Sequence, residues 1–384
     1  MSPGSVISSP TQVSGDTPLH IIGTGPVSLL LRGLLVRQGF GEHELHCDPP
    51  PASLPDWLGQ RAIALSLGSW QLLARVAPPP IGAPITTVEI SLAGALGRTR
   101  LRAAELGVPA VGQVVRYEAL HRALQQGLDH RLTTGPGRPA PAATEAAAAP
   151  AAASTQAPAL TIIADGNPGD DSDLRDFGQS ALLATVQASR PHEGVAWERF
   201  TRDGPLALLP LPENRCWSLV WCAPTEIARA RQALPPAALE AALEQAFGTA
   251  LGRLSLVAAP HLAPLQRRVR QHPPGPATIA IGNAAQTLHP VAGQGLNLGF
   301  RDAFVLAGLL GAARAGARPL STLPAEFARQ RRRDRLAVVA VTDTLATIFT
   351  QPLLHPLQSL ALGALDLVGP SRRALARAFM FGLR

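Results

Sequence analysis

Two short apolar runs, each ending in a glycine-rich turn and followed by a helical pattern, most constrain what this chain can fold into. The first run, His20-Ile21-Ile22, stops at Gly23, and leucines then recur at helical spacing between Leu29 and Leu35. Another short run, which is a candidate strand, lies after that helical pattern, from Glu44 to Cys47. The order strand, glycine turn, helix, strand is typical of an α/β fold that binds a nucleotide.

The first turn reads Gly23-Thr24-Gly25-Pro26-Val27-Ser28 and fits the dinucleotide-binding fingerprint, except that Ser28 replaces the third glycine. Gly23 permits the tight turn, and Gly25 lets the backbone approach a pyrophosphate. The helix that opens at Pro26 supplies free N–H groups at its N-terminus. Asp48 ends the second strand, where an acid would hold a ribose. Taken alone, the motif is also compatible with a plain structural turn.

The second apolar run, Ile279-Ala280-Ile281, enters a longer glycine-rich segment that extends from Gly282 to Gly299. An ordinary loop would not need so many glycines immediately before a helix, which we expect over residues 302–315. Two glycine turns, each placed between a strand and a helix, favour a nucleotide site assembled from distant parts of the chain.

Composition removes several classes of chemistry. All 34 cationic side chains are arginines, which excludes a Schiff-base lysine, a pyridoxal-phosphate anchor and a P-loop lysine. The net charge of +7 is compatible with an anionic partner, although a bias toward arginine codons gives the same balance. Three cysteines without C-x-x-C spacing predict neither a disulfide framework nor a metal site, and they favour a reducing, cytoplasmic compartment.

Several phrases of the chain also occur in one known family. They are Arg61-Ala62-Ile63-Ala64-Leu65-Ser66, Glu198-Arg199-Phe200-Thr201, Gly204-Pro205-Leu206-Ala207-Leu208-Leu209-Pro210 and Gly282-Asn283-Ala284-Ala285-Gln286-Thr287-Leu288-His289-Pro290. In these phrases the chain resembles the class A flavoprotein monooxygenases, and among them the ubiquinone-biosynthesis hydroxylases.

The resemblance implies a fold of the α/β class: a Rossmann-like FAD-binding domain built from discontinuous segments, an antiparallel β-sheet substrate domain and a helical C-terminal tail. The FAD-binding segments are expected at residues 17–75, 100–131, 159–177 and 265–335, and the substrate domain at 76–99 and 178–264. Residues 1–16 are expected to be disordered and show no secretory signal pattern. Residues 132–158 read as an Ala/Pro-rich linker, and 336–384 as a C-terminal helical region.

The resemblance also implies which residues contact FAD. They are Gly23, Gly25, Pro26, Asp48, Arg61, Gln113, Asp165, Gly166, Gly282, Asn283, Pro290, Gly293, Gly295, Leu296 and Asn297. The backbone N–H groups of Leu296 and Asn297 would face the flavin edge on which negative charge develops during reduction. His289 and Pro290 are the candidate catalytic residues, and His289 either relays a proton or packs beneath the loop. After Gly166, an acidic loop is expected in place of the family's short helix.

The implied activity is hydroxylation of a polyprenylated phenol in ubiquinone biosynthesis. NAD(P)H would reduce FAD, O2 would form a flavin C4a-hydroperoxide, and one oxygen atom would pass to the aromatic ring. Other ubiquinone-biosynthesis proteins are expected as partners and nucleic acid is not. A second interpretation stays open, because Ser28, Asn283 and the altered region after Asp165 are also compatible with a degenerate relative that acts as a scaffold subunit.

The C-terminal region leaves one further question open. No formal charge occurs between Asp343 and Asp366, and arginines flank this stretch on both sides. Pro352 and Pro356 lie within it and argue against a membrane-spanning helix. The stretch is expected either to belong to a buried helical pair or to contact a membrane surface. The expected location is therefore cytoplasmic, either free or peripheral on the inner membrane.

Overall fold

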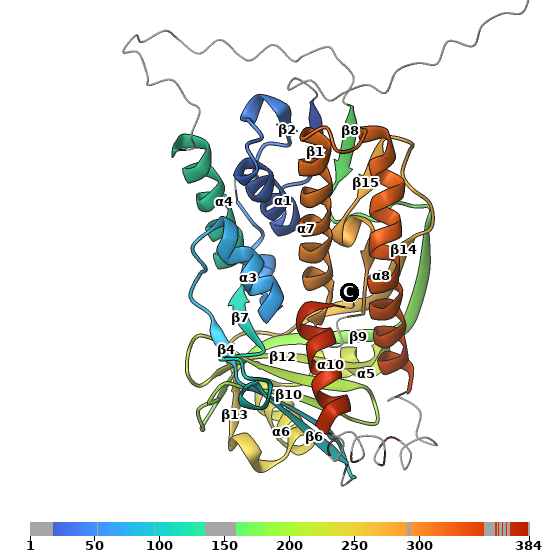
Figure 1. The fold of residues 1–384 in the computed structure, drawn as a ribbon. Helices are drawn as coiled ribbons and strands as arrows, with labels where there is room; N and C mark the ends of the chain where they lie inside the picture. The colour runs from blue at the N-terminus through green and yellow to red at the C-terminus, as the bar shows by residue number, and fades with distance from the viewer. Residues whose placement is uncertain are drawn as a thin grey trace, which may run out of the picture.

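The structure is a computed structural model that describes residues 18–51, 53–95, 97–134, 159–289, 293–348, 358, 360, 363, 366 and 369–382. The expected disordered segment 1–16 lies outside the described residues, as do most of the linker 132–158 and most of the uncharged stretch after Asp343. Within the described part, a helix-covered parallel sheet stands on one face of a large, mainly antiparallel sheet (Figure 1).

The upper half is organised by a four-stranded sheet whose neighbouring strands are all parallel. Its order is β15 (Thr278–Ala280), β8 (Leu160–Ile163), β1 (Leu19–Ile22) and β2 (Leu45–Cys47). A second, three-stranded sheet contains β3 (Ala62–Ser66), β7 (Gly112–Arg116) and β4 (Ala83–Ile85). The parallel strands confirm the strand-turn-helix-strand pattern read from the sequence.

Helices cover the parallel sheet because their apolar faces match its buried strands. They are α1 (Pro26–Arg37), α3 (Leu67–Val76), α4 (Tyr117–Thr134), α7 (Gly295–Arg314) and α8 (Leu323–Ile348). The short helix α2 (Asp56–Gly59) lies against α4 instead. The largest core cluster joins leucines of α1 and α7 to Ile21 and Ile162 of the sheet, all of them almost inaccessible. Complete burial of each such side chain contributes roughly 1.5–3 kcal/mol.

The lower half is a nine-stranded sheet with one partner strand, β13 (Leu254–Leu256), off the main path. Its order is β16 (Gln286–Thr287), β14 (His261–Arg270), β9 (Ser172–Ala188), β12 (Cys216–Pro224), β11 (Pro205–Pro210), β10 (Val195–Phe200), β5 (Thr87–Leu92) and β6 (Arg98–Arg102). β11 and β12 pair antiparallel as a hairpin.

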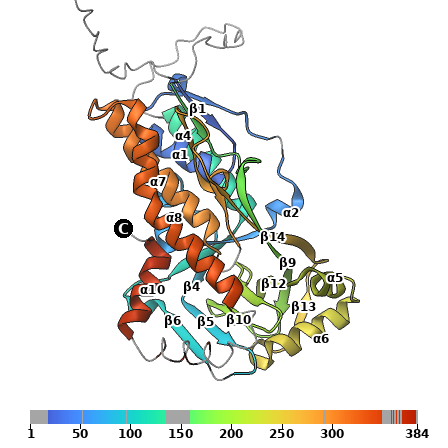
Figure 2. The same cartoon turned by 90° about the vertical axis from the view of Figure 1, so that its right-hand side faces the viewer.

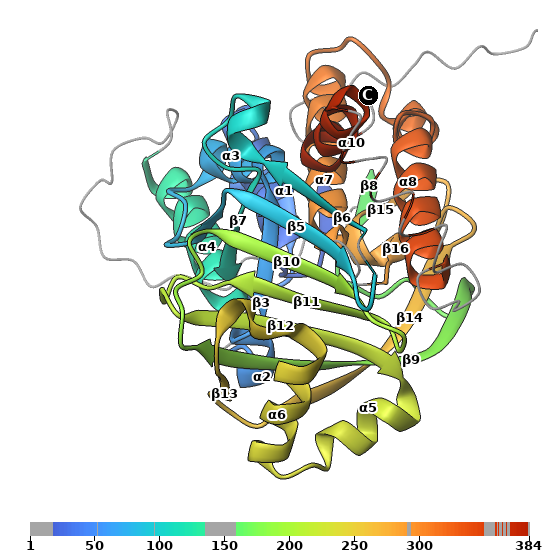
Figure 3. The ribbon, with the colours of Figure 1, turned by 90° about the horizontal axis from the view of Figure 1, so that it is seen from below.

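The large sheet has two different faces. One face packs against α6 (Pro236–Phe247), and α5 (Thr225–Gln232) lies beside it (Figure 3). Trp217 and Trp221 are buried on this face among leucines of the sheet and of α6. The other face is turned toward the parallel sheet and its helices, as Figures 1 and 2 show. The tryptophans therefore serve as core on the side away from the glycine turns.

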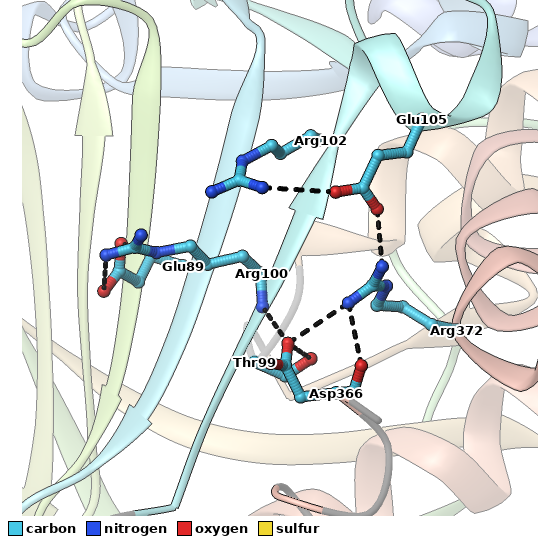
Figure 4. A network of polar contacts seen from close by, with 7 residues as sticks. All are labelled: Glu89, Thr99, Arg100, Arg102, Glu105, Asp366 and Arg372. Atoms are coloured by element: carbon cyan, nitrogen blue, oxygen red, sulfur yellow. Dashed lines mark hydrogen bonds and ion pairs between the residues drawn. The ribbon is translucent and has the colours of Figure 1, made fainter. Parts of the chain in front are cut away.

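The C-terminal helix α10 (Gly369–Phe381) is attached to the edge of the large sheet by charged side chains (Figure 4). Arg372 bonds Glu105 at 2.6 Å and Asp366 at 3.2 Å. Asp366 also accepts hydrogen bonds from the Thr99 hydroxyl at 3.0 Å and the Arg100 backbone N–H at 3.1 Å. Desolvation raises the pKa of Asp366, but these bonds outweigh it and hold the pKa below its usual value.

One helix among the described residues, α7, is long and apolar enough to cross a membrane by length and composition. Of its most apolar window, 61% is buried within the protein, and Leu306 and Leu310 belong to the main core. The central helix of a folded domain is also apolar and buried on several sides. Length and composition alone therefore do not identify α7 as a membrane-spanning helix.

The strands cross several of the expected domain limits. The limit at residue 100 falls inside β6, which belongs to the large sheet, and β4, expected in the substrate domain, pairs with β7 in the small sheet. The limits at 177/178 and 264/265 fall inside β9 and β14, two long strands paired with each other. Likewise α4 runs to Thr134, past the expected linker start, and α8 continues past residue 335. Strand pairing therefore crosses these limits, and the division into domains stays a prediction.

Candidate functional site

Three turns meet at the carboxyl edge of the parallel sheet. Gly23 follows β1, Ala164 and Asp165 follow β8, and Gly282 follows β15, and these three strands are direct neighbours. Gly23 has φ +106°, and a Cβ there would lie only 2.5 Å from the Ala164 carbonyl carbon. Glycine is therefore required at this position both by the backbone angle and by the close approach. The carboxyl edge of such a sheet is where α/β folds bind ligands.

The N-terminus of α1 opens onto free space. Gly25 precedes the helix with an ordinary φ of −76°, Pro26 occupies its first turn, and no side chain caps its N–H groups. A Cβ on Gly25 would meet only the Tyr117 hydroxyl, at 3.8 Å. The backbone N–H of Tyr117 donates to the Arg61 carbonyl oxygen at 2.8 Å, and the Arg61 side chain is exposed. A helix N-terminus beside an exposed guanidinium favours a phosphate group.

Asp48 is attached to the same turn. One of its carboxylate oxygens accepts the Gly23 backbone N–H at 2.7 Å, so the side chain at the end of β2 holds the glycine turn in place. The other oxygen makes no hydrogen bond to the residues that the structure describes, which leaves it available to a ligand hydroxyl. Ser28 is completely buried in the first turn of α1, so the third fingerprint position accepts serine without displacing the helix.

The second glycine-rich segment packs directly on α1. Gly282 has φ +61°, and a Cβ on Gly299 would lie 2.7 Å from Val27 Cγ2 and 3.1 Å from the Gly282 Cα. This contact brings the first turns of α1 and α7 together. Asn283 is exposed beside it, with its Oδ1 3.9 Å from where a Gly295 Cβ would lie. The space at Gly25 and Gly295 is therefore a cradle that side chains would fill.

Asn297 fixes the start of α7. Its side chain accepts the Ser66 backbone N–H at 2.8 Å and donates to the carbonyl oxygens of Ala64 at 3.0 Å and Gly293 at 2.9 Å. These bonds join α7 to the end of β3. The backbone N–H groups of Leu296 and Asn297 lie in the first turn of α7, where helix N–H groups have no partner within the helix. This is the position that the sequence predicted for them, and their contact with flavin remains a prediction.

The remaining predicted site residues are distributed over several other elements. Gln113 lies on β7, half-buried, and lines a cavity of about 150 Å³ together with Trp70 and Pro84. Asp165 and Gly166 are exposed just after β8, and the Asp165 carboxylate accepts the Asn167 backbone N–H at 2.9 Å. The acidic loop expected after Gly166 ends where the long strand β9 begins, at Ser172. Pro290 lies outside the described residues.

His289 is buried, with 1% of its surface exposed, and its ring meets the Phe177 ring edge to face at a centroid distance of 5.0 Å. Desolvation lowers the pKa of His289 to about 4, so the imidazole is neutral near pH 7. This environment suits packing beneath the loop better than proton exchange at neutral pH. Its catalytic role stays a prediction without support from this geometry.

A buried ionic cluster behind the turns was not predicted. Asp302 on α7 is fully buried, accepts the Gly282 backbone N–H at 3.1 Å, and pairs with Arg331 at 2.6 Å and Arg335 at 3.0 Å. Asp334 pairs with Arg331 at 2.7 Å and Arg301 at 3.3 Å. Burial raises the pKa of Asp302, but the two arginines outweigh it and hold the pKa below its usual value. The only sequence signal was a run of arginines on α8, which favoured a solvent-facing surface.

Two turns with exposed backbone N–H groups, a ribose-type acid and an exposed arginine together suit a dinucleotide of the FAD type. Residues 170–340 match the model of a family described as FAD binding domain. Over these residues the chain is similar to that FAD-binding family. A cradle left open at Gly25 and Gly295 fits this cofactor, since both glycines lie at helix N-termini with room above them.

Curated relatives include enzymes of ubiquinone biosynthesis. A ubiquinone hydroxylase of Rhodospirillum rubrum is 37% identical over 212 residues, which are 54% of this chain and 49% of that protein. The 3-demethoxyubiquinol 3-hydroxylase of Escherichia coli is 34% identical over 202 residues, which are 51% of each chain. The chain thus spans about half the length of the curated relatives it matches. Over the matched half, the chain is similar to ubiquinone-biosynthesis hydroxylases, as the sequence phrases predicted.

Solved structures extend the likeness of fold to nearly the whole chain. PqsL of Pseudomonas aeruginosa, described as a probable FAD-dependent monooxygenase, superposes with a TM-score of 0.69 over 91% of this chain and 99% of its own. The two sequences are 20% identical, so this comparison shows the fold alone. It confirms the predicted α/β architecture with a large sheet beneath the FAD-binding half.

Proposed function

We propose that this protein is an FAD-dependent monooxygenase that hydroxylates the aromatic ring of a polyprenylated phenol in ubiquinone biosynthesis, with NAD(P)H as reductant and O2 as oxidant. The observation that carries the proposal is the meeting of the Gly23, Asp165 and Gly282 turns at one edge of the parallel sheet, beneath the open N-terminus of α1. The identities of the curated relatives support the substrate class.

Each group at this edge has a distinct binding task. The N–H groups of α1 and the exposed Arg61 would hold the pyrophosphate of FAD, and Asp48 would hold its ribose. Asn283, exposed at the start of the second segment, can accept from a ribityl hydroxyl without adding negative charge beside the phosphates. The first turn of α7 would place fixed N–H dipoles at the flavin ring. The flavin, when bound, supplies the oxygen-transfer chemistry.

A purified sample tests the proposal directly. We expect a yellow protein with the absorption of oxidised flavin, and NAD(P)H oxidation that accelerates when an alkylphenol is added. The product should carry one additional oxygen atom by mass spectrometry. A deletion strain should accumulate the phenol that this protein hydroxylates, which identifies the ring position. A colourless protein that takes up no added FAD would contradict the proposal.

The alternative is a scaffold subunit without catalysis, which Ser28 and Asn283 left open. Several observations weigh against it: Ser28 fits the first turn of α1, Asn283 is exposed in the cradle, and no side chain blocks the α1 N-terminus among the residues described. Other ubiquinone-biosynthesis proteins are proposed as partners, since a lipid-soluble intermediate must pass from one enzyme to the next.

We propose a cytoplasmic protein that contacts the inner membrane peripherally through its C-terminal region. Arg372 is already paired with Glu105 and Asp366, so the attraction would come from Arg373 and Arg377, which are exposed on α10. Replacing both with glutamine is expected to weaken binding to anionic vesicles by about 30-fold, since each basic residue near such a surface contributes roughly 1 kcal/mol. A double replacement of Arg229 and Arg253 serves as the charge-matched control, and equal vesicle binding by both variants would contradict membrane contact through α10.

A further inference from the structure

Glu198 lies in the middle of β10 and points to the face of the large sheet that is opposite α6. Its two neighbours show the direction, because side chains alternate along a strand. The Trp197 ring meets Phe247 of α6 at a centroid distance of 5.4 Å, and Arg199 Nε donates to the Ala246 carbonyl oxygen at 2.9 Å. Glu198 therefore projects away from α6, toward the half of the molecule that carries the glycine turns.

The strand register places Glu198 in a row of side chains that crosses the sheet from β6 to β14. The row is Thr99, Ile90, Glu198, Ala207, Val220, Leu183 and His261. Glu198 is the one carboxyl group in this row, and its direct neighbours on both sides are apolar. Such a row offers an apolar surface with a single acidic group at its centre.

The FAD-binding half lies over this face of the sheet. At one end of the row, His261 stacks on Trp57 of α2 at a centroid distance of 5.8 Å. At the other end, Thr99 donates to Asp366 of the C-terminal region. Two residues before Glu198, Ala196 packs in one cluster with Ala83 and Val114 of the small sheet. These contacts lie above the two ends of the row, and they enclose its centre from both sides.

Between these contacts the face is not fully packed. Ala207, Val220 and Leu183 are each half-buried, whereas leucines at alternate positions on the α6 face are completely buried. Glu198 is half-buried too, and within the part of the chain that the structure describes no hydrogen bond or ion pair holds its carboxylate. An apolar surface with room above it and one unpaired carboxylate suits an aromatic ring with a hydroxyl group.

The electrostatic surroundings of Glu198 are unusually simple. Desolvation raises the pKa of Glu198 to about 7. The titratable neighbour is Cys222 on β12, whose pKa is raised by burial and then by the Glu198 charge, so it stays a neutral thiol. Farther along the row are His261 at one end and Asp366, paired with Arg372, at the other. Glu89 and Arg100 on the adjacent strands bind each other on the opposite face.

We propose that Glu198 is the general base that accepts the proton of the substrate's phenol group. This inference rests on the proposed function. The phenol O–H bond breaks, its electron pair stays on oxygen as a phenolate, and a carboxyl O–H bond forms on Glu198. The phenolate donates more electron density to the ring carbons that receive oxygen. After hydroxylation the proton returns to the product oxygen, so the carboxylate is regenerated. A base is most effective when its pKa lies near the working pH.

The test compares the FAD-loaded wild type with Glu198→Gln, using 4-propylphenol as the probe. Its affinity is measured between pH 5.5 and 9 from the change in the flavin absorption spectrum. A carboxylate accepts the phenol proton only while ionised, so wild-type affinity should fall by up to tenfold per pH unit as the pH drops below about 7. The glutamine variant should show no such dependence. Its rate of hydroxylation should fall by about 10²–10⁴-fold.

Two further variants sharpen the result. Glu89→Gln changes the same residue type on the neighbouring strand but on the opposite face, and it should keep the wild-type pH dependence. Glu198→Asp retains a carboxylate set back by one methylene, so it should keep the acid dependence with an intermediate rate, and it provides the comparison if the glutamine variant folds poorly.

The outcomes separate this inference from the proposed function. Normal wild-type binding and turnover, together with an unchanged pH profile and rate in Glu198→Gln, would overturn the role of Glu198 alone. A wild-type holoprotein that neither binds nor oxidises any alkylphenol would overturn the proposed function and this inference with it.

Discussion

Asp302→Asn is expected to reduce the free energy of unfolding by about 3–5 kcal/mol, the usual loss when one member of a buried ion pair is removed. The side chain is fully buried and bonds Arg331 and Arg335 at 2.6 and 3.0 Å. Asparagine leaves both guanidinium groups without their shared carboxylate. It also weakens the bond to the Gly282 backbone N–H, so FAD affinity should fall together with stability. Chemical denaturation of the flavin-free protein measures the first effect, and flavin titration measures the second.

The pH dependence of the free energy of unfolding provides a second test of Asp302→Asn. The folded-state pKa of Asp302 is lowered, so its contribution is complete above the unfolded-state pKa and is lost as the pH falls through the folded-state pKa. Wild type should therefore lose stability in acid more steeply than Asp302→Asn. Glu326→Gln, which removes a more accessible partner of Arg329 on α8, should leave the unfolding midpoint unchanged. A loss below about 1 kcal/mol in Asp302→Asn would show that the buried cluster does not hold the two helices together.

The sequence predicted those parts of the site that are encoded locally. Gly23, Gly25 and Asp48 could be placed because a glycine turn between a strand and a helix has one common geometry, and the structure sets them together through the 2.7 Å bond from Gly23 to Asp48. Gly282 followed from the same reasoning, whereas the role of Gly295 was implied by the family resemblance. Each required only a short window of sequence and knowledge of what a helix N-terminus can bind.

The residues that were missed depend on contacts between elements that are separated in the sequence, by 29 positions for Asp302 and Arg331. Asp302 meets Arg331 only because α8 folds back on α7, and an arginine-rich helix favours an exposed surface when considered alone. Arg372 is one of the arginines that flank the uncharged stretch, and it reaches Glu105, 267 positions away. The direction of Glu198 became visible only from the register of β10 with β5 and β11. Local pattern does not specify which strands become neighbours.

Gly25→Trp is expected to abolish FAD binding while leaving the fold intact. The φ of −76° at Gly25 is ordinary for any residue, and a side chain there would enter open space above the α1 N-terminus and not the protein core. The indole would occupy the position proposed for the pyrophosphate. We expect an affinity loss of at least about 1000-fold, equivalent to roughly 4 kcal/mol. The purified variant should be colourless, with the unfolding temperature of the flavin-free wild type.

A tryptophan elsewhere on a helix provides the matched control. Gly308 on α7 is exposed and has no atom within 4 Å of its Cβ position, so Gly308→Trp should remain yellow. The same pair separates catalysis from scaffolding in a deletion strain, because both proteins should fold and only one should bind flavin. An enzyme requires that Gly308→Trp restore ubiquinone and Gly25→Trp fail. If Gly25→Trp restores ubiquinone while lacking flavin, the protein contributes to the pathway as a scaffold subunit.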